Sequence, residues 1–149
     1  MKIAIGCDQG GLVLKTAVKA CIESLGHTFV DFGTDTEKSC DYPDFALTVA
    51  EKVADGTFDK GILLCGTGIG MAICANKVKG IRAATCADEF SAKATAAHND
   101  SNILTMGGRV VDTALAQKIV TLWLTTPYEG GRHQRRLDKI AAVENKYFK

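Results

Sequence analysis

Apolar residues along the chain follow two alternating patterns, short β-rich runs and longer segments with helical spacing. The short runs predict strands at residues 2–6, 28–32, 61–65, 81–85 and 102–106. After each run comes a segment in which apolar side chains recur every three or four residues, as they do on one face of a helix. Five successive strand–helix units favour a parallel sheet that helices cover on both faces.

Glycine and aspartate residues mark the ends of the expected helices. The first helix carries an apolar stripe, and Gly26 ends it in the manner of a left-handed cap. That stripe consists of Leu14, Val18, Cys21 and Leu25. The second, fourth and fifth helices have Asp44, Asp88 and Asp112 as caps or first-turn residues. The third helix begins in a glycine-rich loop. A sixth helix, from Arg132 to about Tyr147, has no strand behind it, and such an appended helix often docks on a partner subunit.

Composition narrows the class of protein further. The chain has 149 residues, 18 basic and 17 acidic, and 46% are hydrophobic, which fits one compact domain over residues 1–149. No apolar stretch approaches the roughly 20 residues of a membrane helix, and the amino-terminal run is too short for a signal peptide, so we expect a cytoplasmic protein. A net charge of +1 gives no reason to expect a nucleic-acid partner. The six cysteines form no CxxC pair and the three histidines are far apart, so the spacing of a zinc site is absent.

The thiol of Cys65 follows the third predicted strand and opens the glycine-rich loop CGTGIG. In a parallel sheet, ligands bind beyond the carboxyl ends of the strands, where helix N-termini favour anions. A thiol there is stabilised as a thiolate, which suits a general base, and Thr67 with the amides of Gly66, Gly68 and Gly70 could bind an oxyanion. Most cysteines are simply buried, but the position of this one at a strand end, before such a loop, favours chemistry.

Other uses of the glycine loop fit less well. The sixth position of the dinucleotide fingerprint GxGxxG is held by Met71, and the loop follows the third strand instead of the first. No GxxxxGK[ST] segment occurs. A thiol phosphatase would need an arginine where Met71 stands. The sequence therefore gives no support to a nicotinamide cofactor or a nucleotide triphosphatase.

Basic residues near the carboxyl terminus indicate an anion site. Arg132 and Arg136 are four residues apart, hence on one helix face, and can reach the same phosphate. A short basic run is by itself usually a solvated helix face. The two glycines before it and Arg109, in GGRVV, make a phosphate pocket the better interpretation.

Eight segments follow one another across nearly the whole chain: IAIGCD, DYP, CGTGIG, ANK, GIRA, HND, GGRVV and YEGGRHQRR. Together they resemble the ribose-5-phosphate isomerase B (RpiB/LacAB) family. The resemblance implies a Rossmann-like three-layer αβα sandwich with a five-stranded parallel sheet and an appended C-terminal helix. It also implies a homodimer or a dimer of dimers, no metal or cofactor, and interconversion of ribose 5-phosphate and ribulose 5-phosphate in the pentose phosphate pathway.

The resemblance assigns a role to each matching residue. Cys65 would move a proton between C2 and C1 through an enediolate, and His98 would open the furanose ring. Contacts with the sugar and the intermediate would come from Asp8, Gln9, Tyr42, Asn99 and the loop residues Gly66, Thr67, Gly68, Ile69 and Gly70. The phosphate would be bound by Arg109, Arg132 and Arg136, with His133 assisting.

Two features leave alternatives open. Gln9 stands where the family commonly has histidine, and glutamine carries no charge and cannot titrate, which puts phosphate affinity or help in ring opening in doubt. His98 could instead cap the end of a helix. The alternative functions are isomerisation of a six-carbon sugar phosphate, allose 6-phosphate or galactose 6-phosphate, and non-catalytic sugar-phosphate binding.

Chain direction separates Cys65 from His98 and Asn99. Cys65 ends a strand, whereas His98 and Asn99 precede the start of the fifth strand, near the opposite edge of the sheet. A five-residue strand is roughly 17 Å long, so a histidine could not easily cross that span. We therefore predict a two-fold dimer in which Asp8, Cys65 and the glycine loop of one chain meet His98 and Asn99 of the other.

Overall fold

The computed structural model describes residues 1–149 and contains one five-stranded sheet. The strands are β1 Lys2–Cys7, β2 Thr28–Asp31, β3 Lys60–Cys65, β4 Ala83–Thr85 and β5 Ile103–Gly107. All four neighbouring pairs are parallel, in the order β2-β1-β3-β5-β4. The predicted parallel sheet is confirmed, and each strand begins and ends within two residues of the expected positions.

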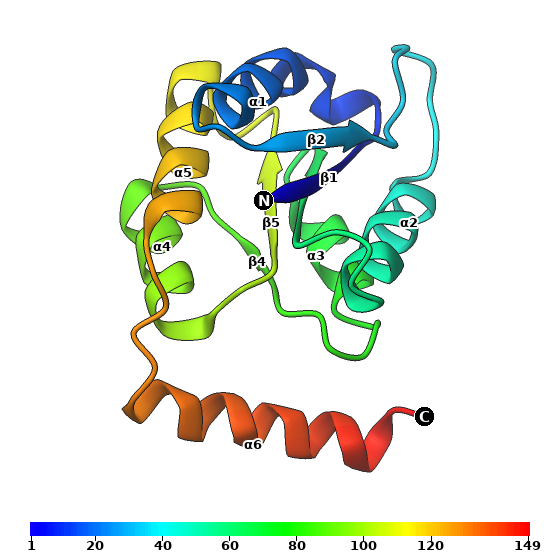
Figure 1. The fold of residues 1–149 in the computed structure, drawn as a ribbon. Helices are drawn as coiled ribbons and strands as arrows, with labels where there is room; N and C mark the ends of the chain where they lie inside the picture. Colours follow the sequence, from blue (N-terminus) through cyan, green and yellow to red (C-terminus); the bar gives the residue numbers. More distant parts are fainter.

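Helices cover both faces of this sheet (Figure 1). They are α1 Leu12–Ser24, α2 Tyr42–Ala54, α3 Ile69–Ala75, α4 Glu89–Ala94, α5 Thr113–Thr125 and α6 Arg132–Tyr147, with short helical turns η1 Gln9–Gly11 and η2 Thr95–Asn99. One apolar cluster joins the sheet to α1, α4 and α5, and a second joins the opposite face to α2 and α3. The three-layer αβα sandwich is therefore confirmed.

The residues predicted to end or begin the helices are also confirmed. Gly26 has a φ of +83°, the left-handed conformation that glycine adopts without strain, and it directly follows the last turn of α1. Asp88 and Asp112 accept hydrogen bonds from the backbone N–H groups of Ser91 and Leu115. Asp44 lies in the first turn of α2.

The C-terminal helix α6 extends along one end of the molecule, below the rest of the fold in Figure 1. Only two of its side chains, His133 and Leu137, are buried. The carboxylate of Glu144 accepts a hydrogen bond from the backbone of Gly80 at 2.9 Å. A cavity of about 370 Å³ lies between α6 and the body, lined by Asn76, Ile81, Arg82, Ala83, Ala84, Thr95, Asn99, Ser101, Ile140, Val143, Glu144 and Phe148. In the chain as a whole, no helix has the length and apolar character to cross a membrane.

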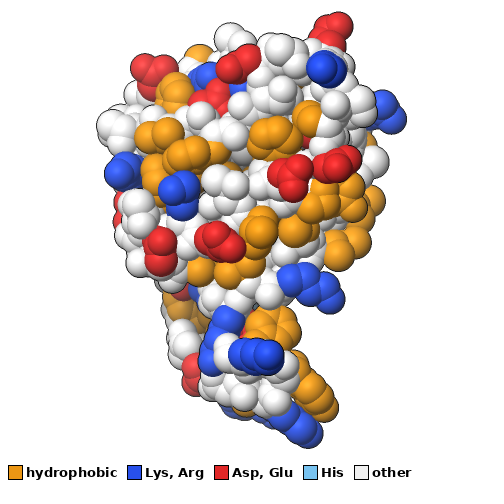
Figure 2. Space-filling view, turned by 90° about the vertical axis from the view of Figure 1, so that its right-hand side faces the viewer, with side chains coloured by type: hydrophobic (Ala, Val, Ile, Leu, Met, Phe, Trp, Pro, Cys, Tyr) orange, Lys and Arg blue, Asp and Glu red, His pale blue; other side chains and the backbone are white.

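Exposed apolar side chains gather on the side of the molecule that carries α2 and α3 (Figure 2). Tyr42 and Leu47 are exposed on α2, and Ile69 and Ile73 on α3. The exposed fractions of Ile69 and Ile73 are 55% and 60%, high for isoleucines one turn apart on a seven-residue helix. This face of α3 lacks apolar cover within one chain.

Candidate active site

Cys65 ends β3 and turns its side chain toward the α2 and α3 layer, where it is 5% exposed. Its Sγ accepts a hydrogen bond from the backbone N–H of Gly68 at 3.0 Å. Gly68 has a φ of +82°, and a Cβ there would lie 2.9 Å from the backbone of Met106, so the turn requires glycine. An N–H group held against the sulfur is oriented to stabilise a negative charge on it.

An open cavity of about 450 Å³ lies in front of this sulfur, at the carboxyl edge of the sheet. Its walls are Asp8, Tyr42, Cys65, Gly66, Thr67, Ile69, Gly70 and Ile73. Seven of these eight residues were predicted from the sequence, and the structure brings them together from β1, α2, β3 and α3. Ile73 was missed, although its position one turn after Ile69 on the same helix face could have indicated it.

The first and third strand-end loops touch beside the cavity. Asp8 is 7% exposed, and its Oδ1 accepts a hydrogen bond from the N–H of Gly10 at 2.9 Å. A Cβ on Gly10 would lie 2.7 Å from the backbone N of Gly66, so only glycine allows the loops to approach this closely. Tyr42 closes the other side, because a Cβ on Gly70 would lie 2.5 Å from its ring. Backbone contact therefore sets the shape of the cavity.

Gln9 lies next to Asp8 but is not among the residues that line the cavity. Its Oε1 accepts hydrogen bonds from the backbone N–H and from the thiol of Cys40, both at 3.2 Å. The side-chain oxygen of Gln9 therefore ties the first strand-end loop to the segment that leads into α2. The contact with Cys40 had no signal in the sequence.

An ion-pair network around the buried Lys15 holds the start of that segment. Lys15 is 4% exposed, and its Nζ lies 2.7 Å from the carboxylates of both Asp31 and Asp35. Burial alone would raise the pKa of Asp31, but hydrogen bonds from Lys15, Lys19 and the backbone of Gly33 outweigh it and hold the pKa below its ordinary value. The network fixes residues 31–35 against the end of β1.

Two other thiols, those of Cys7 and Cys86, lie near strand ends. Burial raises the pKa of Cys7 to about 11, although the charge of Lys15 opposes the shift. Burial, with a contribution from the charge of Asp88, raises the pKa of Cys86 to about 11. Both thiols therefore stay protonated at neutral pH and are poor bases.

Arg109 lies against the loop that follows Cys65, although it is not among the residues that line the cavity. Its backbone N–H donates to the carbonyl oxygen of Gly66 at 3.0 Å. Its side chain passes along the same loop, with Cδ 3.6 Å from the position of a Cβ built on Gly66. An exposed guanidinium beside this loop can bind a phosphate group.

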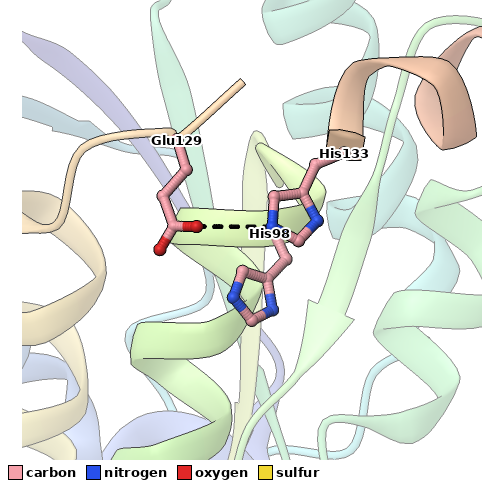
Figure 3. Close-up of side chains that lie close together, drawn as sticks. All are labelled: His98, Glu129 and His133. Atoms are coloured by element: carbon pink, nitrogen blue, oxygen red, sulfur yellow. Dashed lines mark ion pairs between the residues drawn. The ribbon is translucent and has the colours of Figure 1, made fainter. Parts of the chain in front are cut away.

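The remaining predicted residues form a second group at the opposite end of the sheet. Here His98 of η2 stacks on His133 of α6, with ring centroids 4.2 Å apart and planes at 16° (Figure 3). Glu129 Oε2 lies 3.3 Å from His133 Nε2. Burial, and then the charges of Arg132 and His98, lower the pKa of His133, although Glu129 opposes the shift.

The turn that holds His98 and Asn99 is fixed by Arg82. The Nε of Arg82 donates to the carbonyl oxygen of Asn99 at 2.9 Å, and Nη2 donates to that of Asp100 at 2.6 Å. Arg132 and Arg136 are exposed on the first turns of α6. None of these residues lines the Cys65 cavity. Sequence reasoning missed the roles of Arg82 and Glu129, although both lie in quoted segments, GIRA and YEGGRHQRR.

Residues 3–140 match the sequence profile described as Ribose/Galactose Isomerase. The chain belongs to this family. It is similar to the putative sugar phosphate isomerase YwlF of Bacillus subtilis, with 54% identity over 98% of this chain and 99% of the relative. It is also similar to ribose-5-phosphate isomerase B of Escherichia coli, with 48% identity over 97% of each chain.

A solved structure supports the family assignment. Ribose-5-phosphate isomerase B of Clostridium thermocellum aligns with a TM-score of 0.95 and 50% identity over 99% of both chains. The resemblance read from the eight sequence segments is thus confirmed, as are the fold and the class of enzyme, an aldose–ketose isomerase.

Proposed function

We propose that this family member interconverts D-ribose 5-phosphate and D-ribulose 5-phosphate, the reaction expected in the pentose phosphate pathway. The observation that carries the proposal is the position of Cys65, at a strand end, in an open cavity, with a backbone N–H on its sulfur. Asp8 and Thr67 in the same cavity supply contacts for sugar hydroxyls. Similarity to two ribose-5-phosphate isomerases supports the choice of a five-carbon substrate.

The chemistry needs no external oxidant or reductant. His98 protonates the ring oxygen while the C1 hydroxyl gives its proton to water, which returns a proton to His98, and the furanose opens to the aldehyde. The thiolate of Cys65 then takes the proton from C2, and the electron pair forms a C1–C2 double bond with negative charge on O1. Backbone N–H groups of the glycine loop stabilise this enediolate. Return of the proton to C1, with transfer of the O2 proton to O1, gives the ketose.

The reaction requires both groups of residues, the one at the Cys65 cavity and the one at the opposite end of the sheet. At each Cys65 cavity, a second copy of the chain supplies the second group. Within one chain His98, Asn99, Arg132 and Arg136 lie apart from the Cys65 cavity. We propose a two-fold dimer in which Cys65 and Arg109 of one protomer face those four residues of its partner. Three arginines then surround the phosphate, two from one chain and one from the other.

Two complementary surfaces support this dimer. The exposed Ile69 and Ile73 of α3 border the Cys65 cavity. The groove between α6 and the body is largely apolar, and Asn99 forms part of its wall. Docking α3 of one protomer into the groove of the other covers the exposed isoleucines and brings Asn99 and His98 toward the partner's cavity. Because the contact is isologous, it forms two equal sites.

The test is an isomerase assay with separate substrates. Ribose 5-phosphate is added to the purified protein, and ribulose 5-phosphate is followed by its absorbance. Allose 6-phosphate and galactose 6-phosphate are assayed at the same concentrations. We expect the highest kcat/KM for ribose 5-phosphate. A higher value for a six-carbon substrate would reassign the substrate, and binding of all three without turnover would indicate a non-catalytic sugar-phosphate binding protein.

A further inference from the structure

Three potential metal ligands converge where α6 meets the end of η2. His98 is the next-to-last residue of η2, Glu129 lies in the connection between α5 and α6, and His133 lies in the first turn of α6 (Figure 3). One ligand atom from each lies within 4.8 Å of the others. The histidines are 35 positions apart in the chain, which is why sequence spacing gave no sign of the cluster.

Backbone contacts hold Glu129 and His133 in place. The N–H of Glu129 donates to the carbonyl oxygen of Ala97, the neighbour of His98, at 3.0 Å. Gly130 and Gly131 both have positive φ, 65° and 55°, and so let the chain turn sharply between the two side chains. The backbone of Glu129 and His133 is therefore held close to His98 without any bound ion.

The spacing within this cluster fits a tetrahedral ion. His133 is 7% exposed, and its Nε2 has no hydrogen-bond partner although Glu129 Oε2 lies only 3.3 Å away. Two ligand atoms that are each about 2.0–2.1 Å from a tetrahedral zinc ion are roughly 3.3 Å apart. The carboxylate oxygen at 3.3 Å is the one polar partner of this buried nitrogen, and a metal ion between the two atoms would satisfy both.

His98 must turn to complete the site. Its ring is nearly parallel to that of His133, so the in-plane lone pairs of the two rings do not meet at one point. Beside it lies a cavity of about 250 Å³, lined by Phe90, Lys93, Ala94, Ala97, His98 and Glu129. This space allows the ring to rotate and leaves room for a water as fourth ligand. The charges of Lys93 and of Arg132, whose Nη2 lies 3.9 Å from Glu129 Oε2, oppose a cation, and the charge of Glu129 offsets one of them.

We propose that His98, Glu129 and His133 bind one divalent transition-metal ion of the zinc class per chain. Two imidazoles and a carboxylate with an open fourth position are a ligand set that zinc prefers. The ion is an inhibitor instead of a cofactor, because it occupies the nitrogen with which His98 would protonate the sugar ring. The inhibition rests on the proposed function, whereas the binding does not.

Cobalt(II) is the probe for binding, since its visible spectrum reports coordination number and ligand type. The full-length protein is titrated with cobalt chloride in the absence of substrate, and zinc chloride is then added to displace it. We expect one cobalt per chain with an intense tetrahedral spectrum. Glu129→Gln and His133→Gln should each weaken binding by at least about tenfold, the scale seen when a metal site loses a contact. His27→Gln, at the only other histidine, should bind as the wild type does.

Cysteine ligation is the competing explanation. Cys40 and Cys74 are the two partly exposed thiols, and both are replaced by serine in a control variant. A thiolate charge-transfer band, or cobalt binding that is lost in that variant but retained in Glu129→Gln, would overturn the proposal. Absence of cobalt and zinc binding below about 100 μM would also overturn it.

Inhibition is measured separately as the ratio of activities with and without zinc in each variant. We expect a zinc-dependent loss in the wild type and at least about tenfold less sensitivity in Glu129→Gln, in line with its weaker binding. Equal sensitivity in both would contradict the proposed site. If the proposed function is wrong, the protein has no isomerase activity even without zinc. The cobalt titration still shows in that case whether the three residues bind a metal ion.

Discussion

Two inactive variants of this chain should restore activity when they are mixed. In one chain Cys65 and His98 lie at opposite ends of the sheet, and β3 alone, with six residues, spans about 20 Å. If each site takes Cys65 from one protomer and His98 from the other, a dimer of Cys65→Ala with His98→Ala has one intact site and one doubly defective site.

The expected recovery follows from counting sites. Equal amounts of the two variants, after free exchange, give about half heterodimers, and one of the two sites in each is intact, so activity is about a quarter of wild type. Each variant alone should fall by at least about 10²-fold, the scale of a lost acid or base. Activity is followed by the absorbance of ribulose 5-phosphate, and native mass spectrometry measures the heterodimer fraction.

A matched control removes the expected complementation. The double variant Cys65→Ala, His98→Ala is mixed with Cys65→Ala, and no heterodimer then contains an intact site. Heterodimers confirmed by mass that remain inactive in the first mixture would refute the shared site. They would instead indicate that Cys65 and His98 of the same chain serve one site.

Three further changes probe the loop, the phosphate site and the ion-pair network. Gly68→Ala should lower kcat by at least about tenfold, because it disturbs a donor to Cys65. The control Gly26→Ala, at a glycine with a similar φ but nothing within 4 Å of an added Cβ, should affect only stability. Equal activity losses in both variants would contradict a specific role for the loop. Arg136→Ala should weaken ribose 5-phosphate binding by a few kcal/mol and leave unphosphorylated ribose unaffected, with the neighbouring Arg135→Ala as control; equal losses for both sugars would exclude a phosphate role. Asp31→Asn should lower the free energy of unfolding at pH 7 by about 3 kcal/mol, measured by urea denaturation. Because the pKa of Asp31 is below its ordinary value of 3.8 in the folded protein, this stabilisation is complete above that pH and is lost as the pH falls further, so the difference from wild type should shrink in acid.

Local patterns were enough to predict the fold. Each strand–helix unit of this chain has its own spacing of apolar residues and its own end signals, such as Gly26 after α1 and Asp112 before α5. Parallel pairing of the strands then follows from the alternation of strands and helices along the chain. The start of β4 was placed two residues early, at the apolar Ile81, whereas pairing with β5 begins only at Ala83, after the charged Arg82.

One part of the site could be predicted from the sequence, and another part depends on contacts between distant segments. The Cys65 cavity was predictable because strand ends of a parallel sheet meet at one edge. The stacking of His98 on His133, the anchor from Arg82 and the contact of Gln9 with Cys40 were not, because each joins segments whose distance depends on how loops fold back. The single domain, the site roles, the dimer and the cytoplasmic location stay predictions.

The most direct test of the account is the turnover of Cys65→Ala with ribose 5-phosphate, beside the control Cys74→Ala on α3. We expect a kcat at least about 10²-fold below wild type in the first variant, normal turnover in the control, and nearly unchanged binding of a phosphate-bearing inhibitor in both. Near-normal turnover of folded Cys65→Ala would contradict the claim that this thiol is the base.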